Sequence, residues 1–161
     1  MKVYIAGKVS KDSHFGTHHW RDEFCNELSK LSGIQLENLD PLDGARAATP
    51  QQIFSNCVKQ INESELLIVY LSDDISVGGS QEILIAKYLG KPVIGFAPHG
   101  GKFNGATREM LGKVIKDFKD PFVFSTCDSV CGATEDVAEV IKNITQLKKT
   151  SFQVLVENAL K

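Results

Sequence analysis

The sequence has few features of a protein that binds nucleic acid or a membrane. Apart from the pair Lys148 and Lys149 it has no block of like charge, and its formal net charge is -2. Because phosphate backbones are usually bound by a basic face, we expect no polymeric nucleic acid as a partner. No apolar run approaches the roughly 18 residues that span a bilayer, so we also expect no membrane association.

The common signatures of secretion, metal binding and dinucleotide binding are also missing. Met1 leads at once into an apolar strand and not into a signal peptide, so we expect a cytoplasmic protein with reduced thiols. Two of the four cysteines form Cys127-x3-Cys131, which lacks the C-x2-C spacing of common zinc and redox sites. Neither G-x4-G-K-[ST] nor G-x-G-x-x-G occurs. We therefore expect no metal and no cofactor.

The composition is that of one globular domain. The chain has 161 residues, of which 42% are hydrophobic and 24% charged. This length suffices for one domain that buries a core without disulfides or a structural metal. We therefore treat residues 1–161 as a single domain.

Short apolar runs alternate with segments of helical periodicity. We expect strands at residues 3–6, 34–39, 66–71, 91–96 and 122–125. We expect helices at residues 17–31, from Pro50 to at least Ile61, and at 80–89, 107–118, 134–147 and 152–160. This alternation predicts an α/β fold: a doubly wound, flavodoxin-like or Rossmann-like, five-stranded parallel sheet with helices on both faces. The last helix is a candidate contact with a partner chain.

In such sheets the ligand lies beyond the carboxyl ends of the strands. That rule selects the loops at residues 8–16, 40–50 and 72–80. The third loop has Val77, Gly78, Gly79 and Ser80, with Glu82 placed in the first turn of the helix that follows. Glycines allow a ligand to approach the backbone, and a helix start favours a negative group. The pattern alone also fits a Glu82 that only complements the helix dipole or closes a capping box.

Several segments, in order, resemble the nucleoside 2-deoxyribosyltransferase family and the related 2'-deoxynucleoside 5'-phosphate N-hydrolases. Residues 3–7 read V-Y-I-A-G, residues 40–43 read D-P-L-D, and residues 64–69 read S-E-L-L-I-V. Residues 78–86 read G-G-S-Q-E-I-L-I-A and are followed at 90–94 by G-K-P-V-I. The likeness extends over residues 2–97, and its order and spacing are more specific than any single segment.

The resemblance implies roles for particular residues. Glu82 matches the nucleophile of the family, and Tyr4 matches the tyrosine that holds this carboxylate. Asp43 and Asp40 are candidates for the acid that protonates the leaving base, with Asp73 and Asp74 as further candidates. The resemblance and the loop positions together give these expected substrate-binding residues: Gly7, Lys8, Ser10, Asp40, Ser76, Gly78, Gly79 and Ser80. Among them, Lys8, Ser10 and Ser76 match the region that contacts a 5'-phosphate in the hydrolases.

Two positions depart from the family pattern. Cys57 stands where the family usually has an aspartate, and we interpret it as a small core residue, because free cysteine behaves as a hydrophobe. Leu84 stands where the family has a glycine two residues after the nucleophile. A histidine cluster, His14, His18 and His19, has a spacing that a metal can use, but we interpret it as a solvated helix start.

The expected activity is cleavage of the N-glycosidic bond of a nucleoside or nucleotide through a covalent glycosyl-Glu82 intermediate. The alternatives are transfer to a second base, hydrolysis of a 2'-deoxynucleoside 5'-monophosphate, and a nucleotide-binding module without turnover. The resemblance also implies a homodimer or a higher homo-oligomer. The sequence does not choose between purine and pyrimidine or between ribose and deoxyribose.

Overall fold

A five-stranded parallel sheet forms the centre of the computed structural model, which describes residues 1–7, 19–40, 49–71 and 74–161. Its strands are β1 (Lys2–Ala6), β2 (Glu37–Asn38), β3 (Leu66–Tyr70), β4 (Val93–Phe96) and β7 (Ser129–Cys131). They lie side by side in the order β2-β1-β3-β4-β7, and every pair is parallel. This order is that of a flavodoxin-like doubly wound sheet, so the expected fold class is confirmed.

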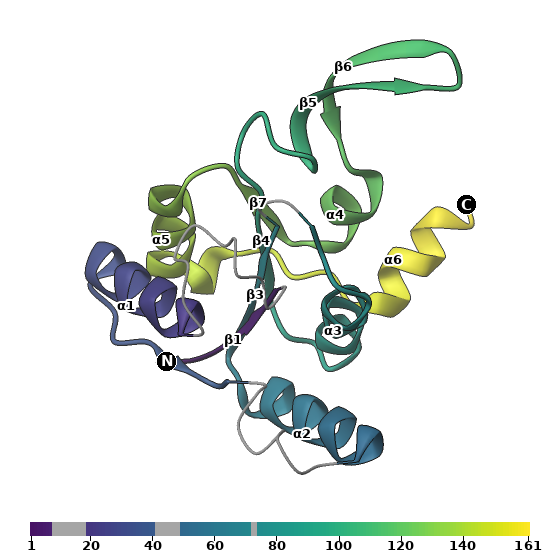
Figure 1. The fold of residues 1–161 in the computed structure, drawn as a ribbon. Helices are drawn as coiled ribbons and strands as arrows, with labels where there is room; N and C mark the ends of the chain where they lie inside the picture. The colour runs from purple at the N-terminus through teal and green to yellow at the C-terminus, as the bar shows by residue number, and fades with distance from the viewer. Residues whose placement is uncertain (8–18, 41–48, 72–73) are drawn as a thin grey trace.

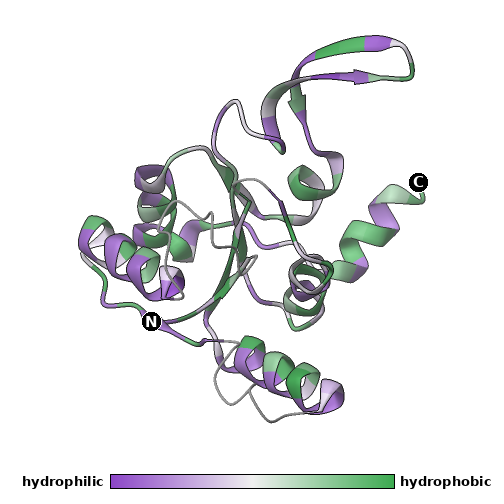
Figure 2. Ribbon diagram, in the orientation of Figure 1, coloured by the Kyte–Doolittle hydropathy of each residue, from purple (hydrophilic) through white to green (hydrophobic). Residues whose placement is uncertain are grey.

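Helices cover both faces of the sheet (Figure 1). The helices α1 (Trp20–Ser32) and α5 (Thr134–Lys142) pack on one face, and α2 (Pro50–Glu63) and α3 (Val77–Tyr88) on the other. The short helix α4 (Pro121–Thr126) and the terminal helix α6 (Phe152–Ala159) lie on the side of α3. Strands β1, β3 and β4 have only buried residues except for Lys2, as expected for central parallel strands. Figure 2 shows this apolar centre between helices of mixed polarity.

Two helix boundaries follow the expected end signals. Gly33 ends α1 in the left-handed conformation, with φ of 70°, which costs glycine little because it has no Cβ. Thr49 caps α2 through a capping box with Gln52, and Pro50 occupies the first helical position. The helix expected at 134–147 ends earlier, at Lys142, and a 3-10 turn, η2 (Ile144–Gln146), follows it.

The expectation of a helix at 107–118 is wrong. This segment forms an antiparallel hairpin of β5 (Asn104–Met110) and β6 (Lys113–Lys119), which projects from the body of the molecule (Figure 1). Its turn has Leu111 and Gly112 with φ of 52° and 74°. Two consecutive residues with positive φ are what a tight hairpin turn requires, and this turn interrupts any helix.

The strand expected at 122–125 is also wrong, although a fifth strand exists. Residues 121–126 form α4, whose N-cap Asp120 accepts hydrogen bonds from the backbone N–H groups of Phe122 and Val123. The cap and Pro121 at the first helical position override the β preference of the apolar side chains. The fifth strand is instead β7, which begins at Ser129. The second strand is shorter than the expected 34–39, because only Glu37 and Asn38 pair with β1.

A buried ion pair fastens α3 to the segment that enters β7. The Lys87 Nζ donates to Asp128 Oδ1 at 2.6 Å, with side chains 1% and 0% exposed. The same carboxylate accepts from the backbone N–H groups of Val93 and Thr150, both at 2.8 Å. One aspartate therefore connects α3, β4, β7 and the approach to α6.

We predict that Lys87→Met lowers the free energy of unfolding by about 3–5 kcal/mol, because it leaves the Asp128 charge buried without its counterion. Urea unfolding of the variant measures this loss. The control is Lys142→Met, which removes a lysine whose side chain is 45% exposed, and it should change stability by less than about 0.5 kcal/mol. Equal effects of the two substitutions would contradict the importance of the buried pair.

Candidate active site

Tyr4 and Glu82 are brought together at the carboxyl-terminal side of the sheet. Tyr4 lies in β1 and Glu82 in α3, and the Tyr4 hydroxyl donates to Glu82 Oε1 at 2.8 Å. Tyr4 is fully buried, so its ring cannot move away without opening the core. The phenol therefore fixes the position of one carboxylate oxygen.

Glu82 lies deeper in its helix than the sequence indicated. The helix α3 begins at Val77, not at the expected Ser80, because the Ser76 side chain caps it by accepting from the Gly79 N–H at 3.0 Å. Glu82 therefore lies in the second turn, and the first turn has no acidic residue. The capping and dipole roles that the sequence left open need a first-turn position, so neither explains this glutamate.

The glycines of the motif lie on the same helix face as Glu82. Gly78 and Gly79 precede it by four and three residues, a spacing that places side chains of a helix on one face. A Cβ on Gly79 would lie 3.1 Å from Ile75 Cγ1, whereas a Cβ on Gly78 would meet nothing nearer than Ser76 Oγ at 3.9 Å. A side chain at position 79 would therefore press on Ile75, whereas position 78 has open space around it.

Burial and hydrogen bonding act in opposite directions on Glu82. Burial raises the pKa of its carboxyl, whereas the hydrogen bond from Tyr4 and the positive charge of Arg21 lower it. The pKa of Tyr4 is raised by burial and then by the Glu82 charge. The phenol is therefore protonated at neutral pH and serves as a permanent donor.

Arg21 is a buried charge beside the Tyr4–Glu82 pair that the sequence reasoning missed. It is only 4% exposed, and its Nε and Nη2 donate to the carbonyls of Ile5 at 3.0 Å and Gly7 at 2.8 Å. The sequence contained a pattern that could have indicated it. Arg21 precedes Phe24 by three residues and Leu28 by seven, which places a charge on the apolar stripe of α1.

Gly7 has a packing reason for lacking a side chain. A Cβ at this position would lie 2.8 Å from Trp20 Cη2, so β1 and α1 approach too closely for any other residue. The structure thus gives Gly7 a role in the fold beside its expected role in substrate binding.

The two departures from the family pattern have different locations. Cys57 is half-buried, and its thiol lies within hydrogen-bonding reach of the Tyr4 hydroxyl and close to Glu82. It therefore faces the site, and the interpretation of Cys57 as a core residue is wrong. Leu84 is 42% exposed and lies on another side of α3, where it lines a cavity. Leu84 consequently leaves the Tyr4–Glu82 pair undisturbed.

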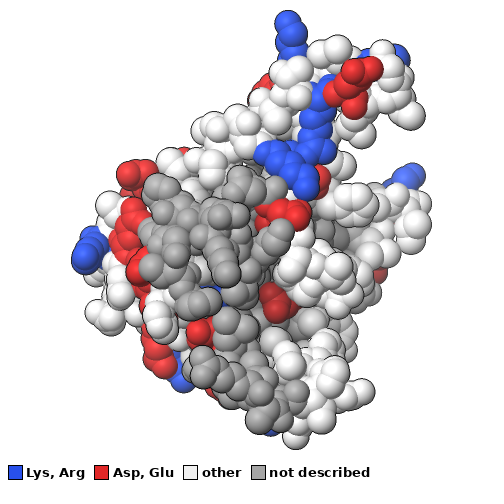
Figure 3. Space-filling model, in the orientation of Figure 1, with Lys and Arg blue, Asp and Glu red and all other residues white. Residues whose placement is uncertain are grey.

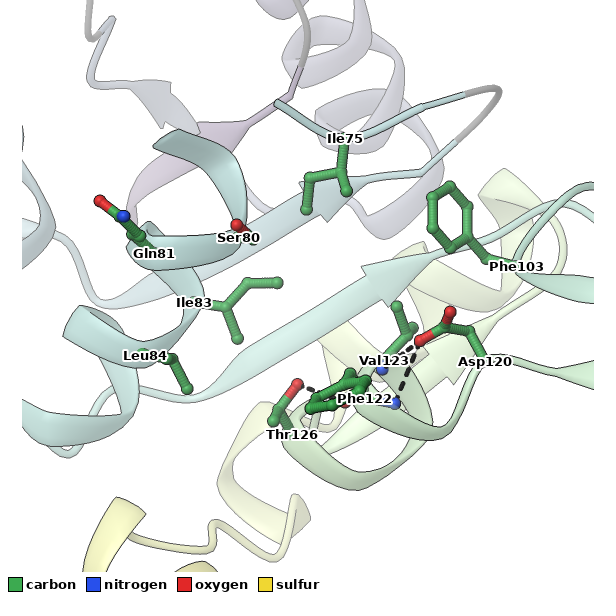
Figure 4. A pocket seen from close by; sticks show the side chains of 10 residues that line it. All are labelled: Ile75, Ser80, Gln81, Ile83, Leu84, Phe103, Asp120, Phe122, Val123 and Thr126. Atoms are coloured by element: carbon green, nitrogen blue, oxygen red, sulfur yellow. Dashed lines mark hydrogen bonds between the residues drawn. The ribbon is translucent and has the colours of Figure 1, made fainter. Parts of the chain in front are cut away.

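That cavity has a volume of about 310 Å³ and lies between α3 and α4 (Figure 4). Apolar side chains such as Ile83, Phe103 and Phe122 dominate its lining. Ser80 also lines it, so this expected substrate-binding residue faces away from Glu82. Neither Tyr4 nor Glu82 is among the described residues that line the cavity.

The remaining expected residues are only partly described. Asp40 follows β2, and its charge acts on Arg21, while its backbone carbonyl accepts from the Gln60 side chain at 2.9 Å. Asp74 forms an ion pair with Lys102 at 3.2 Å. The expected residues that lie outside the described part of the chain are Lys8, Ser10, Asp43 and Asp73, together with His14 and His18.

Within the described residues, no group of three histidine, cysteine, aspartate or glutamate side chains is arranged to hold a metal ion. His19 is 81% exposed and lies 3.9 Å from Asp22. All four cysteines are free, and burial raises the pKa of the Cys25 and Cys127 thiols to about 11 and about 12. Of the helices that the structure describes, none combines the length and apolarity needed to cross a membrane.

Comparison with known proteins supports the fold. No protein-family model and no curated protein matches the sequence, but solved structures do. A 2-desoxiribosyltransferase from Leishmania mexicana has a TM-score of 0.57 and 20% identity, covering 88% of this chain and 97% of its own. A CMP N-glycosidase from Clostridium botulinum has a TM-score of 0.50 and 13% identity, covering 89% and 99%. The resemblance read from the sequence is thereby confirmed at the level of the fold, and function has to be argued from the site.

We predict that Glu82→Gln raises the melting temperature at pH 7. A carboxyl whose pKa is higher in the folded than in the unfolded protein costs stability once the pH rises above its ordinary value. The advantage of the variant should therefore shrink as the pH falls through about 4 and vanish below it, where the carboxyl is protonated in the folded and the unfolded protein alike. Calorimetric scans across this range measure the difference. A variant that melts below the parent protein at pH 7 would contradict the raised pKa.

Proposed function

We propose that this protein is an enzyme that cleaves the N-glycosidic bond of a nucleoside or nucleotide, with Glu82 as the nucleophile. The observation that carries the proposal is the partly buried Tyr4–Glu82 hydrogen bond at 2.8 Å. Support for the substrate class comes from the motif resemblance and from the two structural neighbours, whose names describe a deoxyribosyl transfer and the cleavage of CMP.

The proposed chemistry uses Glu82 from the face of the sugar opposite the base. As the bond from C1' to the base nitrogen breaks, positive charge develops on the sugar ring, and a carboxylate stabilises it. Glu82 Oε2, the oxygen that does not accept from Tyr4, then forms a bond with C1'. Tyr4 keeps the carboxylate oriented throughout this step. The base leaves with the electron pair of the broken bond and takes up a proton.

The proton for the leaving base requires an acid on the other side of the sugar. Asp40 and Asp43 remain the candidates: Asp40 follows β2, which ends at Asn38, and Asp43 comes three residues later in the sequence, outside the described part of the chain. Asp40 is half-buried and close enough to Arg21 for their charges to interact. Asp74 is a weaker candidate, since its carboxylate is paired with Lys102.

The glycosyl-enzyme is released either by a second base, which gives transfer, or by water, which gives hydrolysis. The start of α3 supports a 5'-monophosphate as substrate for the second route. The first N–H groups of a helix have no intrahelical partner and attract anions, and exposed Ser76 and Gly78 lie there. We propose that Ser76, together with Lys8 and Ser10, binds this phosphate when one is present.

We predict that Glu82→Gln loses at least about a thousandfold in turnover, because it removes the nucleophile. Chromatography of deoxynucleosides and their 5'-monophosphates, each incubated with and without a free acceptor base, measures the products. Glu157→Gln, an exposed position in α6, is the control and should retain full activity.

The same panel separates the alternatives. A new nucleoside formed only with an acceptor base identifies a transferase, and a free base released from monophosphates alone identifies a hydrolase. Full turnover by Glu82→Gln would refute the assignment of the nucleophile. Tight binding of nucleotides without any product from the parent protein would identify a binding module.

We also propose that the chain assembles with a second copy of itself through the β5–β6 hairpin. Leu111 is fully exposed and Val114 is 66% exposed at the end of this projecting ribbon, and an isolated two-stranded hairpin is marginally stable in water. Lysine and arginine side chains gather over the hairpin, with some acidic side chains among them, and acidic side chains lie around α1 (Figure 3). The two surfaces are complementary in charge, which favours a partner of the same sequence.

We predict that Leu111→Asp combined with Val114→Asp converts the assembly to a monomer of 17.7 kDa. Aspartate tolerates the positive φ of residue 111, so the turn should remain while its apolar contacts are lost. Light scattering after size exclusion measures the mass. Phe54→Asp, an exposed position in α2, is the control and should leave the assembly intact. A parent protein that is already monomeric would contradict the proposal.

A further inference from the structure

The edge of β1 that faces β2 changes its hydrogen-bond partner halfway along. Carbonyls on one edge of a parallel strand recur at every second residue. The carbonyls of Met1 and Val3 accept from the backbone N–H groups of Glu37 and Leu39, at 2.9 Å and 2.8 Å. The strand β2 ends at Asn38, so this ladder stops while β1 continues.

Arg21 supplies the next two bonds of the same ladder. Its Nε donates to the Ile5 carbonyl at 3.0 Å and its Nη2 to the Gly7 carbonyl at 2.8 Å. Ile5 and Gly7 continue the odd-numbered series, so both carbonyls face the edge that β2 has left. The fork of the guanidinium reaches two carbonyls at once, which the single ammonium of a lysine does not reproduce.

The guanidinium carries a charge into a place with little water. Arg21 is 4% exposed, and its Cζ lies 4.6 Å from the centroid of the Trp20 ring. Among the described carboxylates, those of Asp40, Glu82 and Asp22 act on it. A buried cation is stable only with such compensation, so Arg21 and the carboxylates of the site stabilise one another.

We propose that Arg21 is the positioning residue of this site: its side chain replaces the missing strand beside the end of β1, and its fixed charge favours the ionised form of Glu82. The catalytic consequence rests on the proposed function, because a nucleophilic carboxylate reacts only when ionised. The structural part, a side chain that completes a strand edge, stands without it.

Several groups surround the pair. Tyr4 faces Glu82 from β1, Cys57 faces it from α2, and Asp40 faces Arg21 from the end of β2. Burial raises the pKa of both Tyr4 and Cys57, so these two groups remain neutral between pH 4 and 8, roughly the range in which Glu82 is tested. Among the described residues, the other carboxylates that act on Arg21 are those of Asp40 and Asp22.

The test compares Arg21→Gln with Arg21→Lys, in the full chain. Carbon-13 NMR of the glutamate carboxyls follows the titration of Glu82. The Glu82 resonance is assigned because it is missing from the spectrum of Glu82→Gln. Glutamate carboxyls are observed separately from those of aspartates such as Asp40. We expect Arg21→Gln to shift the midpoint of Glu82 upward by about one unit or more. We expect Arg21→Lys to leave it within about 0.3 units, since the charge remains. The acid limb of the turnover–pH profile should move by the same amounts.

An unchanged midpoint in folded Arg21→Gln, or equal shifts in both variants, would overturn the proposal. The NMR titration needs no turnover, so an inactive parent protein would refute the proposed function and leave this test intact. If Arg21→Gln does not fold, the proposal is tested by NMR of the parent protein. Its Arg21 Hε resonance should exchange slowly and shift with the Glu82 midpoint, and the shift should be absent in Glu82→Gln. A rapidly exchanging Hε, or one that does not respond to Glu82, would refute the proposal.

Discussion

The hydrogen bond from the Tyr4 hydroxyl to Glu82 joins the first strand of the sheet to the third helix, and the site depends on it. Burial disfavours the ionised carboxylate, and the Tyr4 donor, with the charge of Arg21, opposes that effect. Tyr4 can act in this way because its ring is fully buried in a central strand and its own pKa is raised. The fold thus holds both a carboxylate and its donor in place before any substrate binds.

Holding β1 and α3 in place for the Tyr4–Glu82 hydrogen bond also explains features that are distant from these two side chains. Because β2 is short, the end of β1 needs another partner, and Arg21 provides it from α1. The close approach of β1 and α1 then requires glycine at position 7. On the other side, α3 must keep its register, and the buried pair of Lys87 and Asp128 ties its end to β7. The geometry of the candidate site and the stability of the fold therefore depend on some of the same elements.

Most of the fold and the centre of the site were predictable from the sequence, because they depend on local signals. The apolar run of β3, the cap at Thr49 and the stop at Gly33 each act over a few residues. The hairpin was missed because its turn has a non-glycine residue, Leu111, at positive φ. The N-cap Asp120 favours a helix at α4, although the apolar composition of this segment is typical of a strand. Cys57 and Arg21 were misjudged because their roles depend on contacts between distant segments, which periodicity does not reveal.

The covalent intermediate on Glu82 is the central claim, and mass spectrometry tests it most directly. The protein would be mixed with a deoxynucleoside or its 5'-monophosphate without acceptor, quenched in acid over a series of short times and digested. The account predicts that the sugar, or its phosphate, appears on the peptide that contains Glu82 and is absent from Glu82→Gln. Release of free base with no adduct at any quench time, or an adduct on another residue, would contradict it.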